Sequence, residues 1–124
     1  MNLEKVIFGF FIVLAMTLNF GFFLGEIDNP DHHHVYELYA AIVVSLIATV
    51  LKFGDRTQVG AVLLSTSLAA DLQLIAAAIL WAIMGGSMDE ASLMVYIVSL
   101  SGGALMANFV SVILLISETI SQRR

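Results

Sequence analysis

Four long apolar runs constrain this chain more than any other feature. They cover roughly residues 3–24, 30–53, 56–84 and 89–121, and only short gaps separate them. A helix of about 20 residues crosses the ~30 Å hydrocarbon core of a bilayer, so each run is long enough to span it, and the four runs take up most of the 124 residues. With 60% hydrophobic and 12% charged residues, the chain has too little polar surface for a water-soluble fold. The sequence therefore predicts one all-α membrane domain, residues 1–124, with four transmembrane helices.

The basic residues lie on one side of the predicted membrane. Lys5 lies at the start of the first run, Lys52 and Arg56 flank the gap between the second and third, and Arg123 with Arg124 end the chain. The charges in and beside the other two gaps are all acidic: Glu26, Asp28, Asp31, Asp89 and Glu90. Because Lys and Arg near helix ends stay in the cytoplasm, we expect a multi-pass protein with both termini cytoplasmic.

The gaps themselves predict how the helices begin and end. The gap around 52–58 is so short that the second and third helices should form an antiparallel hairpin. Gly54 suits a left-handed helix end, and Asp55 with Gln58 has the spacing of a capping box. Asn29 followed by Pro30 predicts the start of the second helix, which would place three histidines in its first turn.

Asp71 is the most informative single residue, because it lies at the midpoint of the third predicted helix. An unpaired carboxylate at the bilayer centre costs at least ~2.5–3.5 kcal/mol on insertion scales. Ser67 lies one turn away on a face that also carries small residues, so another helix can approach closely. Asp71 is either an ion-binding or proton-carrying group, or a protonated side chain that hydrogen-bonds a neighbouring helix.

Two further helices carry polar stripes. The fourth predicted helix carries Ser101, Ala104, Asn108, Ser111 and Glu118, and the second carries Glu37, Ala41, Ser45, Ala48 and Lys52. The side chains of the fourth helix either line a hydrated path or hydrogen-bond between helices. On the second helix, Glu37 either extends a ring of outer carboxylates in an oligomer, or Glu37 and Lys52 simply reach opposite interfaces. Asn19, Thr66 and Gln73 are predicted partners for hydrogen bonds between helices.

The first outer loop is rich in possible metal ligands, namely Asp28, Asp31, His32, His33 and His34. Consecutive histidines on a helical turn diverge by about 100° each, so one chain cannot easily offer all three to one ion. A site shared between subunits would escape that limit. The alternatives are a divalent-cation site, a pH response through histidine protonation, and a hydrated loop with no specific role.

Several function classes are disfavoured. The chain has no cysteine, no His-Glu-x-x-His, no Gly-x-Ser-x-Gly and no glycine-rich phosphate loop, so we expect no enzyme. We expect no cofactor either, apart from a divalent metal or other cation at the outer loop. The net charge of −5 disfavours a nucleic-acid partner and attracts cations.

Several segments resemble a known family. They are Asn19-Phe20-Gly21-Phe22-Phe23, Ile27-Asp28-Asn29-Pro30, His32-His33, Tyr36-Glu37-Leu38, Leu51-Lys52-Phe53-Gly54-Asp55-Arg56-Thr57 and Ala70-Asp71-Leu72-Gln73-Leu74-Ile75. They resemble an uncharacterised family of short bacterial inner-membrane proteins, over essentially the whole chain. The resemblance implies location in the bacterial inner membrane and supplies no activity.

Two functions fit these observations. The first is a homo-oligomeric channel or transporter for cations, since one four-helix subunit is too small to enclose a hydrated path and still pack. Its predicted ion path is Asp71, Ser67, Asn108, Ser111, Ser101 and Glu37. The alternative is a non-conducting accessory or scaffold subunit of a larger membrane complex, in which the same polar residues only specify packing. The expected partners are the lipid bilayer and further copies of the chain, or that larger complex.

Overall fold

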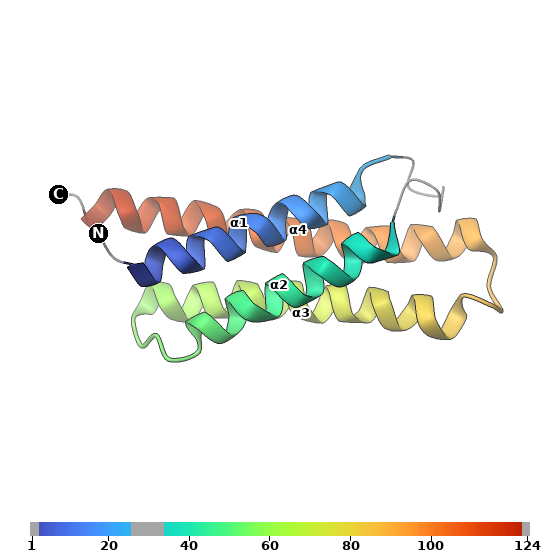
Figure 1. Ribbon diagram of the computed structural model, residues 1–124, viewed down its shortest axis with the longest axis horizontal. Coiled ribbons are helices and arrows are strands. Elements are labelled where there is room, and N and C mark those ends of the chain that lie inside the picture. Colours follow the sequence, from blue (N-terminus) through green and yellow to red (C-terminus); the bar gives the residue numbers. More distant parts are fainter. Residues whose placement is uncertain (1–2, 26–33, 123–124) are drawn as a thin grey trace.

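The fold is a bundle of four long helices (Figure 1). The computed structural model describes residues 3–25 and 34–122. The helices are α1 (Leu3–Phe23), α2 (Val35–Lys52), α3 (Gln58–Met84) and α4 (Glu90–Gln122), and the described residues contain no strand. All four are long and apolar enough to cross a membrane. The predicted all-helical class and the number of helices are therefore confirmed.

Each helix packs against two neighbours around the bundle. Helix α1 contacts α2 and α4, and α3 contacts the same two helices from the other side. Consecutive helices run in opposite directions, so the predicted α2–α3 hairpin is present (Figure 1). The start of α1, the end of α4 and the α2–α3 turn lie at one end of the bundle, which we call the terminal end. The α3–α4 turn lies at the other, which we call the far end.

Helix α2 begins later than the sequence predicts. It starts at Val35, and His34 precedes it with extended backbone angles (φ −81°, ψ 122°) and no side-chain capping bond. An N-cap residue has this non-helical backbone, so the prediction of a histidine-containing first turn is wrong for His34. Asn29, Pro30, His32 and His33 lie outside the described residues.

The α2–α3 turn uses Thr57, rather than Asp55, as the N-cap of α3. The Thr57 hydroxyl accepts a hydrogen bond from the Gly60 backbone N–H at 3.0 Å. Asp55 Oδ1 in turn accepts hydrogen bonds from the Thr57 backbone N–H (2.9 Å) and hydroxyl (2.7 Å). Thr57 takes the cap because it directly precedes the first helical residue, while Asp55 bonds two residues onward as aspartates do in turns. Among the described glycines only Gly25 has a positive φ, so the left-handed end predicted at Gly54 is also wrong.

Apolar side chains cover the outside of the bundle, and its interior contains polar ones. Leu72, Met106 and Phe10 are exposed by 71%, 64% and 61%. A described set of small or polar side chains is buried instead: Asn19, Ser45, Thr49, Ser67, Asp71, Ser101, Asn108 and Ser111. We call this set the polar layer. A surface so continuously apolar marks contact with another apolar medium, as lipid provides.

Candidate functional site

The Asp71 carboxyl lies inside the bundle and is held by α2. It is 5% exposed. The Ser45 hydroxyl donates to Oδ1 at 2.6 Å, and the Thr49 hydroxyl lies 2.5 Å from Oδ2. Ser45 and Thr49 are one helical turn apart, so they reach the two oxygens of one carboxyl from a single face of α2. Among the described residues, Asp71 is the only buried carboxylic acid.

Two further polar pairs join helices on either side of Asp71. Ser101 on α4 donates to Asn19 Oδ1 on α1, and both residues are fully buried. Thr66 on α3 and Ser111 on α4 are 2.5 Å apart between their hydroxyl oxygens, and the Thr66 hydroxyl also lies 2.9 Å from the Leu63 carbonyl. The predicted roles of Asn19 and Thr66 in hydrogen bonds between helices are confirmed.

Some buried polar atoms have no partner among the described residues. These are Ser67 Oγ, both side-chain polar atoms of Asn108, and Asn19 Nδ2. All three side chains are fully buried. An unsatisfied buried polar atom is rare in folded proteins and needs a specific explanation.

The packing of α3 against α4 places Asn108 at about the same depth in the bundle as Asp71. Thr66 faces Ser111, and the Gln73 amide lies against Gly103, where a Cβ atom would overlap it. Because the helices are antiparallel, these two pairs place Asn108 level with residue 69, between Ser67 and Asp71. Ser67, Asp71 and Asn108 therefore lie at a similar depth in the bundle, and we call these three residues the Asp71 cluster. The Asp71 carboxyl itself points to Ser45 and Thr49 on α2.

Apolar clusters close the polar layer toward both ends. Toward the terminal end lie Phe8, Ile12, Ala48 and Leu63. Toward the far end lies a larger cluster that includes Phe22, Leu38, Leu74, Ala77, Met94 and Ile97. On α3, Ser67 and Asp71 lie between Leu63 of the first cluster and Leu74 of the second.

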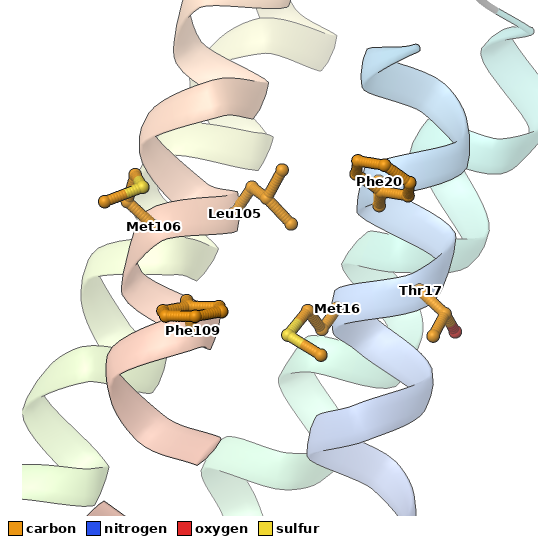
Figure 2. Close-up of a pocket in the computed structure, with 6 residues that line it drawn as sticks. All are labelled: Met16, Thr17, Phe20, Leu105, Met106 and Phe109. Atoms are coloured by element: carbon orange, nitrogen blue, oxygen red, sulfur yellow. The ribbon is translucent and has the colours of Figure 1, made fainter. Parts of the chain in front are cut away.

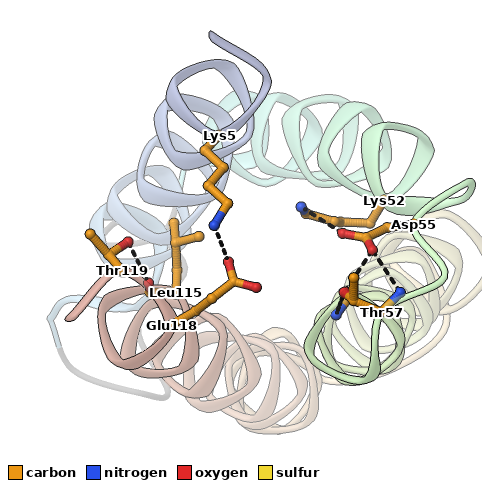
Figure 3. A network of polar contacts seen from close by, with 8 residues as sticks. Lys5, Lys52, Asp55, Thr57, Leu115, Glu118 and Thr119 are labelled. Carbon is orange, nitrogen blue, oxygen red and sulfur yellow. Dashed lines mark hydrogen bonds and ion pairs between the residues drawn. The ribbon is translucent and has the colours of Figure 1, made fainter. Parts of the chain in front are cut away.

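A polar cavity opens at the terminal end, and we call it the vestibule. Its volume is about 450 Å³, and Glu4, Lys5, Lys52, Gly54, Asp55, Arg56, Thr57 and Glu118 line it. Lys5 and Glu118 form an ion pair at 2.9 Å across it (Figure 3). The Lys52 ammonium lies 3.3 Å from Asp55 Oδ2 and 4.5 Å from the centroid of the Phe8 ring.

Asp55 is held in its ionised form by the turn around it. The hydroxyl and the backbone N–H of Thr57 donate to its carboxylate and lower its pKa, against a smaller opposing effect of burial, and Lys52 lowers it further. The vestibule therefore keeps this carboxylate charged at neutral pH.

A second cavity, on the surface between α1 and α4, carries no ion-binding chemistry. It encloses about 320 Å³ and is lined by Met16, Thr17, Phe20, Leu105, Met106 and Phe109 (Figure 2). Its single hydroxyl, on Thr17, donates to the Leu14 carbonyl at 2.9 Å. The groove is thus an apolar surface feature, separate from the polar layer.

Comparison with known proteins identifies the family to which this chain belongs. A family of unknown function, DUF6394, matches residues 32–119. The chain belongs to the DUF6394 family. No curated protein and no solved structure matches it.

The DUF6394 match covers most of the polar layer but stops short of α1. Ser45, Thr49, Ser67, Asp71 and Asn108 all lie within residues 32–119. Asn19 and Lys5, which contribute to the layer and to the vestibule from α1, precede the match. The Asp71 cluster is therefore a feature of the DUF6394 region itself.

The structure separates the other predicted site residues from this cluster. Glu37 is half-buried two turns beyond Ser45 toward the far end, with its carboxylate against Gly21. His34 is exposed at the start of α2, while Asp28, Asp31, His32 and His33 lie outside the described residues. Ser101 and Ser111 lie in the polar layer, but each is engaged by a partner from another helix.

The sequence did not reveal the roles of three residues of the site: Ser45, Thr49 and Lys52. Ser45 belongs to the predicted stripe on the second helix, but nothing in the sequence pairs it with Asp71. Thr49 lies one turn further on the same face of α2 and also carries a hydroxyl. This spacing of two hydroxyls is the sequence signal that could have indicated a contact with both oxygens of one carboxyl. Lys52 is only 3% exposed, so its ammonium faces the vestibule instead of extending to the surrounding medium.

Proposed function

We propose that this chain spans a bacterial inner membrane with its terminal end in the cytoplasm. The support is the distribution of charge: Lys5, Lys52 and Arg56 all line the vestibule at that end. Arg123 and Arg124 follow α4, which also ends there. Helix α3, with 27 residues, is about 40 Å long at 1.5 Å per residue, so Asp71 at its midpoint lies near the bilayer centre.

Within that membrane, the proposed function is the movement of a cation through the interior of the bundle, with Asp71 as its binding group. One observation carries this proposal. The only buried carboxylic acid among the described residues lies at the midpoint of α3, at about the depth of the unpartnered polar atoms of Ser67 and Asn108. Ionisable groups at this depth mark ion pathways and proton relays, because their insertion is costly.

The location of the path differs from the one the sequence favours. An axis between several copies would be lined by residues on the outer surface of the bundle. The large side chains exposed there at mid-membrane are apolar, as Leu72, Met106 and Phe109 illustrate, whereas Asp71 faces α2 of its own chain. We therefore place the path inside one bundle. Association into a homo-oligomer stays a prediction.

In this proposal the two apolar clusters close the path on both sides of Asp71. A cation that enters the vestibule meets Lys5–Glu118 and Lys52–Asp55, then the cluster of Phe8, Ile12, Ala48 and Leu63. The larger cluster blocks the way from Asp71 to the far end. Such an enclosed site suits a transporter that opens to one side at a time more than a permanently open channel.

Cation flux into proteoliposomes tests the proposal, with Asp71→Asn as the decisive variant. Asparagine has the same shape and can hydrogen-bond Ser45 and Thr49, so the fold should persist while the titratable group is lost. Asp89→Asn is the matched control, since Asp89 is exposed in the α3–α4 turn and its carboxylate accepts hydrogen bonds from the Ser92 backbone N–H and hydroxyl. Flux lost in Asp71→Asn and kept in Asp89→Asn supports the proposal. Equal flux in both variants contradicts it.

The second candidate is the non-conducting accessory or scaffold subunit, and a specific observation favours it. Asp71, Ser101 and Ser111 each have a hydrogen-bond partner on another helix of the same chain. Such bonds also hold transmembrane helices together when nothing is transported. This candidate predicts no cation flux in the wild type and none in Asp71→Asn.

A further inference from the structure

We infer that two copies of this chain associate through α3, with the Gln73 side-chain amides of the two copies hydrogen-bonded to each other near the middle of the membrane. The inference assigns an interaction surface and its partner, a second copy. It rests on the proposed membrane location and orientation of the chain, and it does not depend on the transport of a cation.

Gln73 lies near the bilayer centre and is directed away from the interior of its own bundle. It follows Asp71 by two residues on α3, which is a rise of about 3 Å and a rotation of about 200°. Because Asp71 faces α2 inside the bundle, Gln73 is directed outward. Its side chain is partly exposed and lies over Gly103 of α4. An amide therefore reaches the outer surface at a depth where lipid offers only hydrocarbon.

The Gln73 amide has no hydrogen bond to another described residue. Four exposed hydroxyls on the outer surface are satisfied by their own helix, because each donates to a backbone carbonyl three or four residues back: those of Thr17, Ser65, Ser99 and Thr119. The amide presents two N–H hydrogens and an acceptor oxygen, and hydrocarbon can satisfy none of them. Gln73 therefore needs a partner from outside its own bundle.

A second copy supplies that partner at the right depth. In the proposed orientation every copy has its terminal end in the cytoplasm, so the same residue of two copies lies at the same depth. A two-fold axis along the membrane normal then brings one Gln73 to the other. Primary amides are self-complementary, because each can donate an N–H to the Oε1 of the other. Two reciprocal hydrogen bonds would satisfy both side chains.

The surface around Gln73 permits this close approach. Ala69, one turn before Gln73, is exposed, and Ala76, nearly one turn after it, is partly exposed. Small residues of this kind let membrane helices come near enough for side chains to hydrogen-bond. One amide pair at a single depth does not line a path through the membrane, so the cation path stays inside each bundle.

The first test measures association in lipid. Fluorescently labelled protein is placed in liposomes at several protein-to-lipid ratios, and photobleaching steps are counted against random occupancy. We expect wild type to change from dimer to monomer as lipid dilutes it. Gln73→Leu should raise the dissociation constant by about tenfold, the effect of two hydrogen bonds between membrane helices. Gln58→Leu is the matched control, because Gln58 is exposed at the start of α3, far from the bilayer centre.

The second test keeps Gln73 in place and uses cross-linking. The chain has no cysteine, so a single substitution introduces a single thiol. We expect oxidation to join Ala69→Cys chains as disulfide dimers. Val43→Cys is the control and should stay monomeric, because Val43 is 57% exposed on α2, two residues before Ser45 and so at a similar depth.

The outcomes separate this inference from the proposed function. Wild type that is monomeric at every ratio would overturn the inference. Equal dissociation constants for Gln73→Leu and Gln58→Leu would overturn the role of the amide, and equal cross-linking of the two cysteine variants would overturn the interface. Cation flux measured in the same vesicles is independent of these results: a wild type that dimerises without any flux would keep this inference and overturn the proposed function.

Discussion

Ser45 and Thr49 stand one turn apart on α2, and each contacts a different oxygen of the Asp71 carboxyl. This two-point contact fixes the orientation of the carboxyl and leaves it inside the bundle of its own chain. It also means that three side chains, on two helices, form one hydrogen-bonded unit. A substitution of any one of these side chains should therefore alter the hydrogen bonds of the other two.

Thr49→Val tests this unit, because valine keeps the shape of threonine and removes only the hydroxyl. Asp71 Oδ2 would lose its partner, and an unsatisfied buried polar group costs about 1–3 kcal/mol. We expect the free energy of unfolding in detergent to fall by an amount in that range. Thr119→Val is the control: Thr119 is exposed, and its hydroxyl donates to a backbone carbonyl four residues back, as that of Thr49 can. Equal stability losses in the two variants would contradict the unit.

The contact between Asn19 and Ser101 should stabilise the packing of α1 on α4. Hydrogen bonds between membrane helices average about 0.6 kcal/mol in double-mutant cycles. We expect a coupling energy of that size between Asn19→Leu and Ser101→Ala. A coupling energy of zero would show that the two side chains do not interact in the folded protein.

Thr57, the N-cap of α3, should contribute to the free energy of unfolding although it is exposed. Thr57 accepts from the Gly60 N–H and donates to Asp55, so Thr57→Ala removes both bonds. Loss of an N-cap costs about 1 kcal/mol. We expect a loss of at least that size from denaturant unfolding, and Thr57→Ser should restore most of it. Failure of serine to rescue the stability would mean that the methyl group, not the hydroxyl, is what matters.

The ionised Asp55 should make stability depend on pH. The hydrogen bonds from Thr57 lower the pKa of Asp55 in the folded state below its unfolded value. A carboxyl with a lowered folded pKa stabilises the protein fully above the unfolded pKa, and this contribution is lost as the pH falls through the folded pKa. The stability difference between wild type and Asp55→Asn should therefore be largest near pH 7 and shrink in acid. A difference that is constant between neutral and acidic pH would contradict this role.

Much of the fold could be predicted from the sequence, because its dominant signal is local. Four apolar runs predict four helices, and the short gap after Lys52 predicts the α2–α3 hairpin. The starts of α2 and α3 could not be predicted as well, since His34 and Thr57 take their cap positions through backbone geometry that several neighbouring residues could provide.

The site was predicted in part. The depth of Asp71 follows from its place in the third run, and this made it a candidate at once. Its partners depend on how the helices rotate about their axes, and that rotation is set by packing. Ser45 and Thr49 therefore became recognisable as its partners only when α2 and α3 were seen together.

The most direct test of the central claim, an Asp71-dependent cation path inside one bundle, is cation flux at decreasing protein-to-lipid ratios. At the highest dilution most occupied vesicles contain a single chain. We predict that each occupied vesicle still fills, and that it fails to fill when the chain carries Asp71→Asn. Flux that vanishes on dilution would show that the path lies between copies. Its absence at every ratio would contradict conduction altogether.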